Sequence, residues 1–296
     1  MNDTRTGALQ VLITYILWGS LPIFWKLLSE INSVYILSQR VIWSALFMVI
    51  FLLIKGHLPK TLSVFKNPKT VFYCFICGVL ITLNWGVYIY AVTSGHVLDA
   101  SLGYFIEPIV VAIIGVILFK EKLNKAETAT FAFAIVGLAY MLVTSGTLPV
   151  LSLVIAISFG LYGACKKSTS LDASTSLFME TLCMTPFAIA FALWSERAGI
   201  GAIGTLSGWE FILLPACGDV TSIPLLLFNL GVKKIPFYLA GIIMYASPTI
   251  QFLTGIFFFH EAFDTNRAIA FLIIWIGISF TLIHQLLMLK KSAKNS

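Results

Sequence analysis

The sequence alternates ten apolar runs, each about 20 residues long, with short segments that hold most of the charged residues. A run of this length crosses a hydrocarbon core about 30 Å thick when it forms an α-helix. The pattern predicts an all-α integral membrane protein with ten transmembrane helices, in a single transmembrane domain over residues 1–296. The predicted spans are 7–27, 35–54, 70–92, 98–119, 127–144, 149–165, 174–194, 210–230, 238–259 and 267–289.

The low charge content excludes a soluble globular protein. Charged residues make up 11% of the chain, whereas a soluble domain has about 25%. The two longest connections, 55–69 and 195–209, have 15 residues each, which leaves no room for a soluble catalytic or ATP-binding domain. The sequence has no G-x-x-x-x-G-K-S/T phosphate loop, so any driving energy is expected from a gradient. The basic residues flank the spans without interleaved aromatics, and we therefore expect no nucleic-acid partner.

The distribution of Lys and Arg predicts the orientation of the chain, because cytoplasmic loops carry an excess of both. With both termini in the cytoplasm, only Lys26, Arg197 and Arg267 lie on the outer side, at span ends or in a loop, and Arg40 lies within a span. The other fifteen fall inside: Arg5, Lys55, Lys60, Lys66, Lys69, Lys120, Lys122, Lys125, Lys166, Lys167, Lys233, Lys234, Lys290, Lys291 and Lys294. This pattern predicts a multi-pass protein with cytoplasmic ends.

Comparison of the chain with itself at an offset of 140 residues indicates an internal repeat. Gly19 and Lys26 match Gly160 and Lys167 with one residue of slip. The ungapped matches are Cys77-Gly78 with Cys217-Gly218, Pro108 with Pro248, Gly115 with Gly255, Phe119 with Phe259, Glu121 with Glu261, Phe131 with Phe271, and Gly137 with Gly277. We expect a first five-helix repeat over 7–145 and a second over 149–289.

An odd number of spans in each half forces the second repeat to insert upside down. Inverted repeats recur in transporters, because two copies in opposite orientations supply two equivalent gates. Such symmetry also occurs in channels, so it favours transport in general. Glu121 and Glu261 follow matched spans, and we interpret them as symmetric structural or gating acids.

Four charged residues lie deep in the predicted spans, where a charge costs about 2.5–3.5 kcal/mol. Arg40 suits a carboxylate or phosphate and is a candidate substrate anchor. Glu180 is its counterpart in the second repeat, while Glu107 and Asp219 could bind protons or a cation for coupling. Arg40 and Glu107 lie at depths that would allow pairing. The alternative is that these charges form structural pairs that fix helix packing.

One face of the span 70–92 carries Ile81, Asn84, Trp85 and Tyr88 at positions i, i+3, i+4 and i+7. An amide and two aromatic rings with polar edges could line a cavity for a ring-bearing or amphipathic solute. An interfacial aromatic belt is the alternative, and it suits Tyr90 best.

Pro108 and Pro248 are expected in the middle of matched spans, where each would free a backbone carbonyl. Broken helices at matched positions point to a central binding site. Static kinks are the alternative. The five cysteines and four histidines form no zinc-binding pattern: Cys74-x-x-Cys77 lies in an apolar run, and His260-Glu261 lacks a second His. We expect no metal and no cofactor.

Several motifs resemble the RarD branch of the EamA-type transporters, in the drug/metabolite transporter superfamily. The resemblance covers nearly the whole chain and includes Asn84-Trp85 and Glu180-Thr181. The longer motifs are Tyr15-Ile16-Leu17-Trp18-Gly19, Gln39-Arg40-Val41-Ile42-Trp43-Ser44, Ala100-Ser101-Leu102-Gly103-Tyr104-Phe105-Ile106, Phe159-Gly160-Leu161-Tyr162-Gly163 and Tyr245-Ala246-Ser247-Pro248-Thr249. Gln39 and Glu107 depart from the His and Asn that are typical of the family at these positions, and Asp219 is also atypical.

The resemblance implies two inverted five-helix repeats in a bacterial inner membrane and the export or exchange of small metabolites or drugs. It extends the candidate substrate-binding set to Arg40, Asn84, Trp85, Tyr88, Tyr104 and Glu180, with Glu107, Asp219, Pro108 and Pro248 as coupling or gating candidates. The expected function is therefore a secondary transporter working by alternating access, rather than an enzyme. A passive channel is the alternative, and an intramembrane enzyme would need an acid/base or metal constellation that the sequence does not display.

Overall fold

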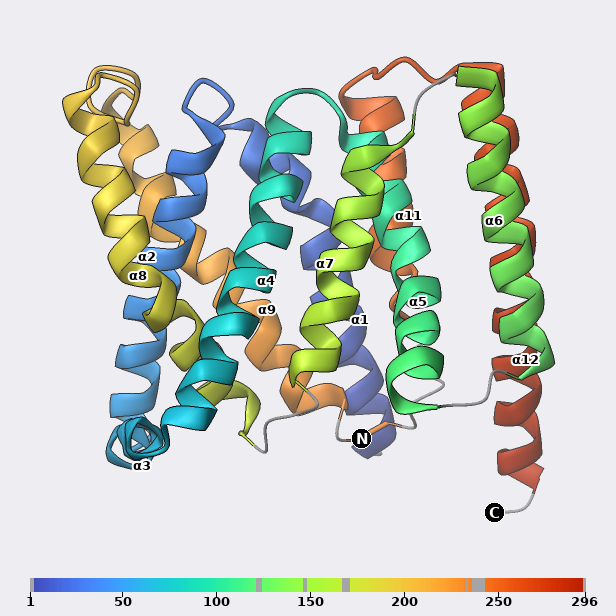
Figure 1. Cartoon of the computed structure of the whole chain (residues 1–296), viewed down its shortest axis with the longest axis horizontal. Helices are drawn as coiled ribbons and strands as arrows, with labels where there is room; N and C mark the ends of the chain where they lie inside the picture. The colour runs from blue at the N-terminus through green and yellow to red at the C-terminus, as the bar shows by residue number, and fades with distance from the viewer. Residues whose placement is uncertain are drawn as a thin grey trace. The chain divides into compact units, whose positions relative to one another are not determined.

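A computed structural model describes residues 3–120, 124–145, 148–166, 171–232, 234–235 and 243–294. The described residues are helical or lie in short connections (Figure 1). The elements of the first half are α1 (Asp3–Lys26), α2 (Ser33–Ile54), α3 (Leu58–Leu62), the 3₁₀ turn η1 (Ser63–Lys66), α4 (Pro68–Thr93), α5 (Val97–Phe119) and α6 (Lys125–Ser145). Those of the second half are α7 (Val150–Lys166), α8 (Ala173–Arg197), the 3₁₀ turn η2 (Gly208–Ile212), α9 (Leu213–Val232), α11 (Ala246–Leu253), the π-helical segment η3 (Thr254–Phe258) and α12 (Thr265–Lys294).

Eight helices of the described chain are long and apolar enough to cross a membrane. Helix α7 is apolar but has only 17 residues. The predicted span 238–259 corresponds to α11 and η3, and its residues 238–242 lie outside the described part. The all-α membrane fold is therefore confirmed, while the total of ten spans stays a prediction.

Large apolar side chains on the membrane helices point outward from the chain. Val143 on α6 is 83% exposed and Phe187 on α8 is 63% exposed. Exposed apolar area on this scale is unusual for a soluble monomer and typical of a lipid-facing surface. The exposure agrees with the low charge content of the sequence.

The capping residues at the starts of equivalent helices recur at the predicted offset of 140 residues. Asn32 accepts hydrogen bonds from two backbone N–H groups at the start of α2, and Asp172 does the same at the start of α8. Asn124 accepts the N–H of Glu127 at the start of α6, and Asp264 accepts that of Arg267 in the first turn of α12. Capping side chains satisfy N–H groups that have no partner within the helix. The two repeats are therefore similar even in the single residues that cap their helices.

The backbone conformation repeats as well. Lys120 ends α5 with φ 55°, and His260 follows η3 with φ 53°. Both lie in the left-handed region, which non-glycine residues rarely adopt. These are the two non-glycine residues with positive φ in the described part of the chain, and they are 140 positions apart.

The described chain divides into two compact units, and each contains helices from both repeats. Unit 1 comprises 1–20, 95–160 and 230–296, and unit 2 comprises 21–94 and 161–229. Helices α1 and α7 contribute residues to both units.

In unit 1, α6 packs along α12, its counterpart in the other repeat, and the two run in opposite directions (Figure 1). A Cβ on Gly137 would meet the carbonyl oxygen of Ala270 at 3.2 Å, and one on Gly277 would meet that of Thr130 at 3.1 Å. The two contacts are equivalent in the repeat, because Gly137 corresponds to Gly277 and Thr130 corresponds to Ala270, each at an offset of 140. Helix α5 packs likewise against α11, around a core that includes Phe105.

In unit 2, α2 packs along its repeat counterpart α8, and the two helices again run in opposite directions (Figure 1). Helix α4 packs against both. The short helix α3 lies at one end of this unit, and the segment joining α8 to η2 lies at the other (Figure 1). Unit 2 therefore pairs equivalent helices of the two repeats.

Candidate functional site

Arg40 lies in the interior of unit 2, where α2, α4 and the end of α1 meet. Its side chain is 4% exposed. The guanidinium carbon lies 4.1 Å from the ring centroid of Trp85 and 5.1 Å from that of Trp25. A cation over an aromatic face is stabilised by the ring quadrupole, by about 2 kcal/mol when water is excluded. The two indoles thus hold a cation inside an apolar helix bundle.

Glu180 on α8 is the centre of a second polar cluster in unit 2. It is 1% exposed. Its Oε1 accepts a hydrogen bond of 2.5 Å from Ser176 and lies 3.4 Å from Lys166 Nζ, while its Oε2 accepts one of 3.0 Å from Tyr162. Lys166 also donates to the Tyr162 hydroxyl at 2.5 Å. The buried carboxylate is therefore paired and hydrogen-bonded, as a charge in such a place must be.

The two clusters occupy equivalent places in the two repeats. Glu180 matches Arg40 at the offset of 140, and Lys166 matches Trp25 at the offset of 141 that aligns α7 with α1. The same helix-to-helix contact thus holds a cation against a ring in one repeat and an anion against an ammonium group in the other. The charges at the two sites are opposite in sign.

One face of α4 joins the clusters. A Cβ on Gly78 would meet the Glu180 carbonyl oxygen at 2.8 Å, whereas Trp85, seven residues further along, contacts Arg40. Seven residues of helix span about 10 Å. Asn84 and Tyr88 on the same helix are buried. The predicted stripe therefore lies largely in the protein interior, which distinguishes it from Tyr90, whose side chain is half exposed.

Other candidates lie elsewhere. Asp219 is on α9 of unit 2 and is exposed. Tyr104, Glu107 and Pro108 are on α5 of unit 1, with Glu107 buried and close enough to Tyr15 and Tyr245 to act on both electrostatically. Arg40 and Glu107 belong to different units, so their pairing stays a prediction.

Pro108 and Pro248 differ in their place in the helix. Pro108 lies inside the continuous helix α5, as expected. Pro248 lies in the first turn of α11 rather than in mid-helix, because that helix begins at Ala246. A proline there breaks no helical hydrogen bond. Its carbonyl accepts a hydrogen bond of 2.9 Å from Ser101 Oγ of α5.

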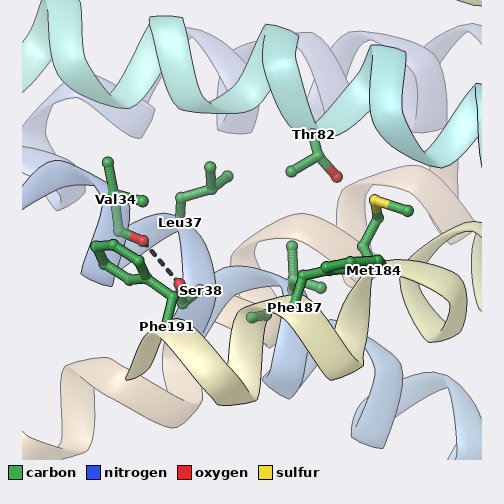
Figure 2. Close-up of a pocket in the computed structure, with 9 residues that line it drawn as sticks. Val34, Leu37, Ser38, Thr82, Met184, Phe187 and Phe191 are labelled. Atoms are coloured by element: carbon green, nitrogen blue, oxygen red, sulfur yellow. Dashed lines mark hydrogen bonds between the residues drawn. The ribbon is translucent and has the colours of Figure 1, made fainter. Parts of the chain in front are cut away.

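A cavity of about 260 Å³ lies between α2, α4 and α8, and its lining is apolar (Figure 2). Leu37, Met184 and Phe187 point into it, and the Ser38 hydroxyl donates to the Val34 carbonyl on its own helix (Figure 2). None of the sequence-predicted site residues lines it. Because Phe187 is also largely exposed, we interpret this hollow as part of the lipid-facing surface.

Outside the membrane helices, Glu261 joins the segment before α12 to the start of α5. Its carboxylate accepts the N–H groups of Val97 at 2.6 Å and Leu98 at 2.9 Å. Burial is the largest influence and raises the pKa of Glu261, against the opposing effect of these N–H groups. A polar hollow of about 250 Å³ surrounds it, lined also by His96, Asp264 and Arg267. Its repeat counterpart Glu121 lies outside the described residues.

Sequence reasoning missed the partners of the two buried charges. Lys166 was assigned to a loop, but it lies in the last turn of α7 and reaches Glu180. Trp25 lies near the end of the predicted span 7–27 and was not among the candidates, yet it is fully buried. The spacings Ser176–Glu180 and Tyr162–Lys166, each i to i+4, are the signals that could have indicated shared helix faces.

Apolar helices with lipid-facing surfaces, two matched repeats and buried charges in the interior define a multi-pass membrane protein. The profile of the EamA-like transporter family matches residues 5–143 and again 148–283. Two bacterial relatives match nearly the whole chain. YojE of Bacillus subtilis, named an uncharacterized transporter, is 38% identical over 279 residues, 93% of each chain. Protein RarD of Streptomyces exfoliatus is 33% identical over 277 residues, 94% of this chain and 88% of its own.

A solved crystal structure has the same fold, with a TM-score of 0.63 at 18% identity, and the match covers 94% of this chain and 98% of the other. The chain belongs to the EamA-like transporter family, in its RarD branch, and it is a membrane transporter. The two profile matches fall on the two predicted repeats.

Proposed function

We propose that the chain is a secondary transporter that exports or exchanges small metabolites, amino-acid-like solutes or drugs by alternating access. The observation that carries the proposal is the pair of buried charges, Arg40 and Glu180, at equivalent positions of the two repeats. A static scaffold would gain little from burying charges at such cost, since well-packed apolar side chains are often as stable. A solute-binding site needs them.

The geometry supports a site along α4 in unit 2. Arg40 and Glu180 would bind the charged groups of the solute, and Asn84 with Trp85 and Tyr88 would bind its polar and ring-bearing parts. Tyr104, on α5 of unit 1, is a further candidate for substrate binding. Glu107 and Asp219 are the candidates for proton or cation coupling, and Pro108 and Pro248 for gating.

Two matched repeats support alternating access, because exchange of their conformations converts an outward-facing state into an inward-facing one. We infer a bacterial inner-membrane location from the bacterial relatives, and cytoplasmic termini from the Lys and Arg distribution. The substrate set remains a class of solutes, defined by the charges that the site offers.

The test is a transport assay with the purified protein in liposomes, across a panel of metabolites and antibiotics, with and without a proton gradient. We expect saturable uptake and counterflow of at least one solute, and loss of both in Arg40→Ala and Glu180→Gln. Lys55→Ala is the control, since Lys55 lies at a helix end and only approaches an aromatic ring, that of Phe51, at 5.9 Å. Flux without saturation or counterflow would indicate a channel, and unchanged transport in both variants would refute the site.

A further inference from the structure

Two thiols from different helices lie in contact beside the Glu180 cluster. Cys77 Sγ on α4 and Cys165 Sγ on α7 are 2.9 Å apart, and both residues belong to unit 2. A disulfide bond is about 2.05 Å long, so closure needs a movement of less than about 1 Å. The two residues are 88 positions apart in the chain, so a bond between them would tie two separate helices.

The surroundings place this pair where the helices around Glu180 meet. Cys165 directly precedes Lys166, the ion-pair partner of Glu180. Cys77 directly precedes Gly78, whose α-carbon packs against the Glu180 backbone. A bond between the two sulfurs would therefore hold α4 and α7 in the arrangement that keeps Glu180 paired.

Exposure differs between the thiols and gives them different roles. Cys77 is buried, whereas Cys165, near the end of α7, is half-buried. An oxidant from water would reach Cys165 first, and the buried thiol would act as the resolving group.

We propose that Cys77 and Cys165 are a redox-active pair whose reversible disulfide ties α4 to α7 and stops transport. With hydrogen peroxide as the two-electron oxidant, Cys165 forms a sulfenic acid and releases one water. Cys77 then attacks the sulfenic sulfur, the S–S bond forms, and a second water leaves. Two thiols and one peroxide thus give one disulfide and two waters, and a dithiol reductant reverses the reaction.

The repeat supplies a matched control. Cys217 is the counterpart of Cys77, but its thiol donates to the carbonyl of Leu213 on its own helix at 3.2 Å. The position equivalent to Cys165 is Phe24, which has no thiol. Cys217→Ser should therefore leave the reaction intact.

The experiment treats the full chain in liposomes with hydrogen peroxide, precipitates it in acid to stop thiol exchange, dissolves it in dodecyl sulfate at neutral pH, and counts maleimide-reactive thiols by mass. We expect the five cysteines to fall to three reactive thiols, with a Cys77–Cys165 crosslinked peptide, and recovery after a dithiol reductant. Cys77→Ser and Cys165→Ser should each abolish the crosslink, while Cys217→Ser should retain it. Five reactive thiols after oxidation, or a crosslink between other cysteines, would overturn the pairing.

The effect on transport rests on the proposed function and is measured separately. Transport should fall in proportion to the crosslinked fraction, recover with reductant, and resist peroxide in Cys77→Ser. Amide hydrogen exchange in the last turn of α7 should slow on oxidation. This measurement detects the disulfide link between α4 and α7 even if no solute is transported. If the crosslinked protein has the same transport and the same amide hydrogen exchange as the reduced protein, the proposal that the disulfide stops transport is wrong. Absence of transport in either redox state would instead count against the proposed function.

Discussion

The guanidinium of Arg40 lies over the faces of two indole rings, an arrangement that its planar shape favours. A guanidinium stacks on aromatic faces and is less strongly hydrated than an ammonium group, so it tolerates burial better. Its fork can also bind a carboxylate or phosphate through two parallel hydrogen bonds. The same residue can thus be held by Trp25 and Trp85 while it recognises an anionic group.

We predict that Arg40→Lys transports the solute with a much weaker apparent affinity than the unchanged protein in the liposome assay. The lysine keeps the charge but loses the stacking and the two-pronged contact, which costs about 1.5–3 kcal/mol, or about 10- to 100-fold in apparent affinity. The apparent affinity for the transported solute is the measurement. Full activity in Arg40→Lys would show that charge alone is needed.

We predict non-additive effects for Lys166 and Glu180. Lys166→Met alone leaves the carboxylate of Glu180 without its cation and should lower the stability by about 1–3 kcal/mol, since a buried unpaired charge is destabilising. Adding Glu180→Gln should recover most of the loss, because the pair is then removed together. Thermal unfolding in detergent measures both variants, and strict additivity would mean that the two groups do not interact.

At the scale of the helices, glycines in unit 2 allow α4 to approach α8 closely and α9 to approach α2 closely. A Cβ on Gly78 would meet the Glu180 carbonyl oxygen at 2.8 Å, and one on Gly218 would meet the Trp43 carbonyl oxygen at 2.6 Å. Backbone atoms cannot move aside as a flexible side chain can, so the added methyl must separate the helices.

We predict that Gly78→Ala and Gly218→Ala each lower the stability by about 1–3 kcal/mol, the usual cost of overpacking. The control is Gly163→Ala in α7, where a Cβ meets nothing within 4 Å. That change should be neutral or stabilising, since alanine favours a helix by about 1 kcal/mol. Unfolding midpoints in detergent compare the three, and equal midpoints would contradict the close packing.

Helix α8, which carries Glu180, begins at a charged cap. Asp172 accepts the N–H groups of Ser174 and Thr175, each at 3.1 Å. Burial, the largest influence, raises the pKa of Asp172, but the hydrogen bonds from Thr175 and Ser174 outweigh it and the net pKa is lowered. The carboxylate therefore stabilises the fold above its unfolded pKa of about 3.9, and this contribution is lost as the pH falls through the lower folded value.

We predict that Asp172→Ala costs about 1 kcal/mol at neutral pH, whereas Asp172→Asn keeps a capping oxygen and costs less. The asparagine variant should also lose the part of the acid destabilisation that belongs to this residue. Unfolding midpoints measured from neutral to acidic pH test both statements. An acid profile of Asp172→Asn identical to that of the unchanged protein would contradict the assignment.

Much of the element level could be predicted from the sequence. Apolar run lengths predicted α2, α5 and α8 to within three residues at each end, because membrane thickness fixes the length of a span. The π-helical segment η3 and the break before α11, which begins at Ala246, could not be predicted, since hydropathy does not report hydrogen-bond register. The place of Pro248 was missed for the same reason.

At the scale of the whole chain, the repeat could be predicted from the sequence, but the packing of its helices could not. The offset of 140 indicated that two halves share one fold, and the matched caps at Asn32 and Asp172 agree. Pairing of α2 with α8 and of α6 with α12 depends on contacts between the halves, about which the pattern of one helix says nothing. The contact of Arg40 with two indoles could not be predicted for the same reason, although a charge within an apolar span did mark Arg40 itself as a candidate.

If the second repeat is the first one turned over in the membrane, equivalent loops of the two repeats lie on opposite sides. Lys60 and Ile200 are repeat counterparts, and both are exposed. We would introduce single cysteines at each in a cysteine-free background and label intact cells with a membrane-impermeant maleimide. An inverted second repeat predicts labelling at Ile200 from outside and at Lys60 only after the membrane is opened, whereas labelling of both positions from the same side would contradict the inversion.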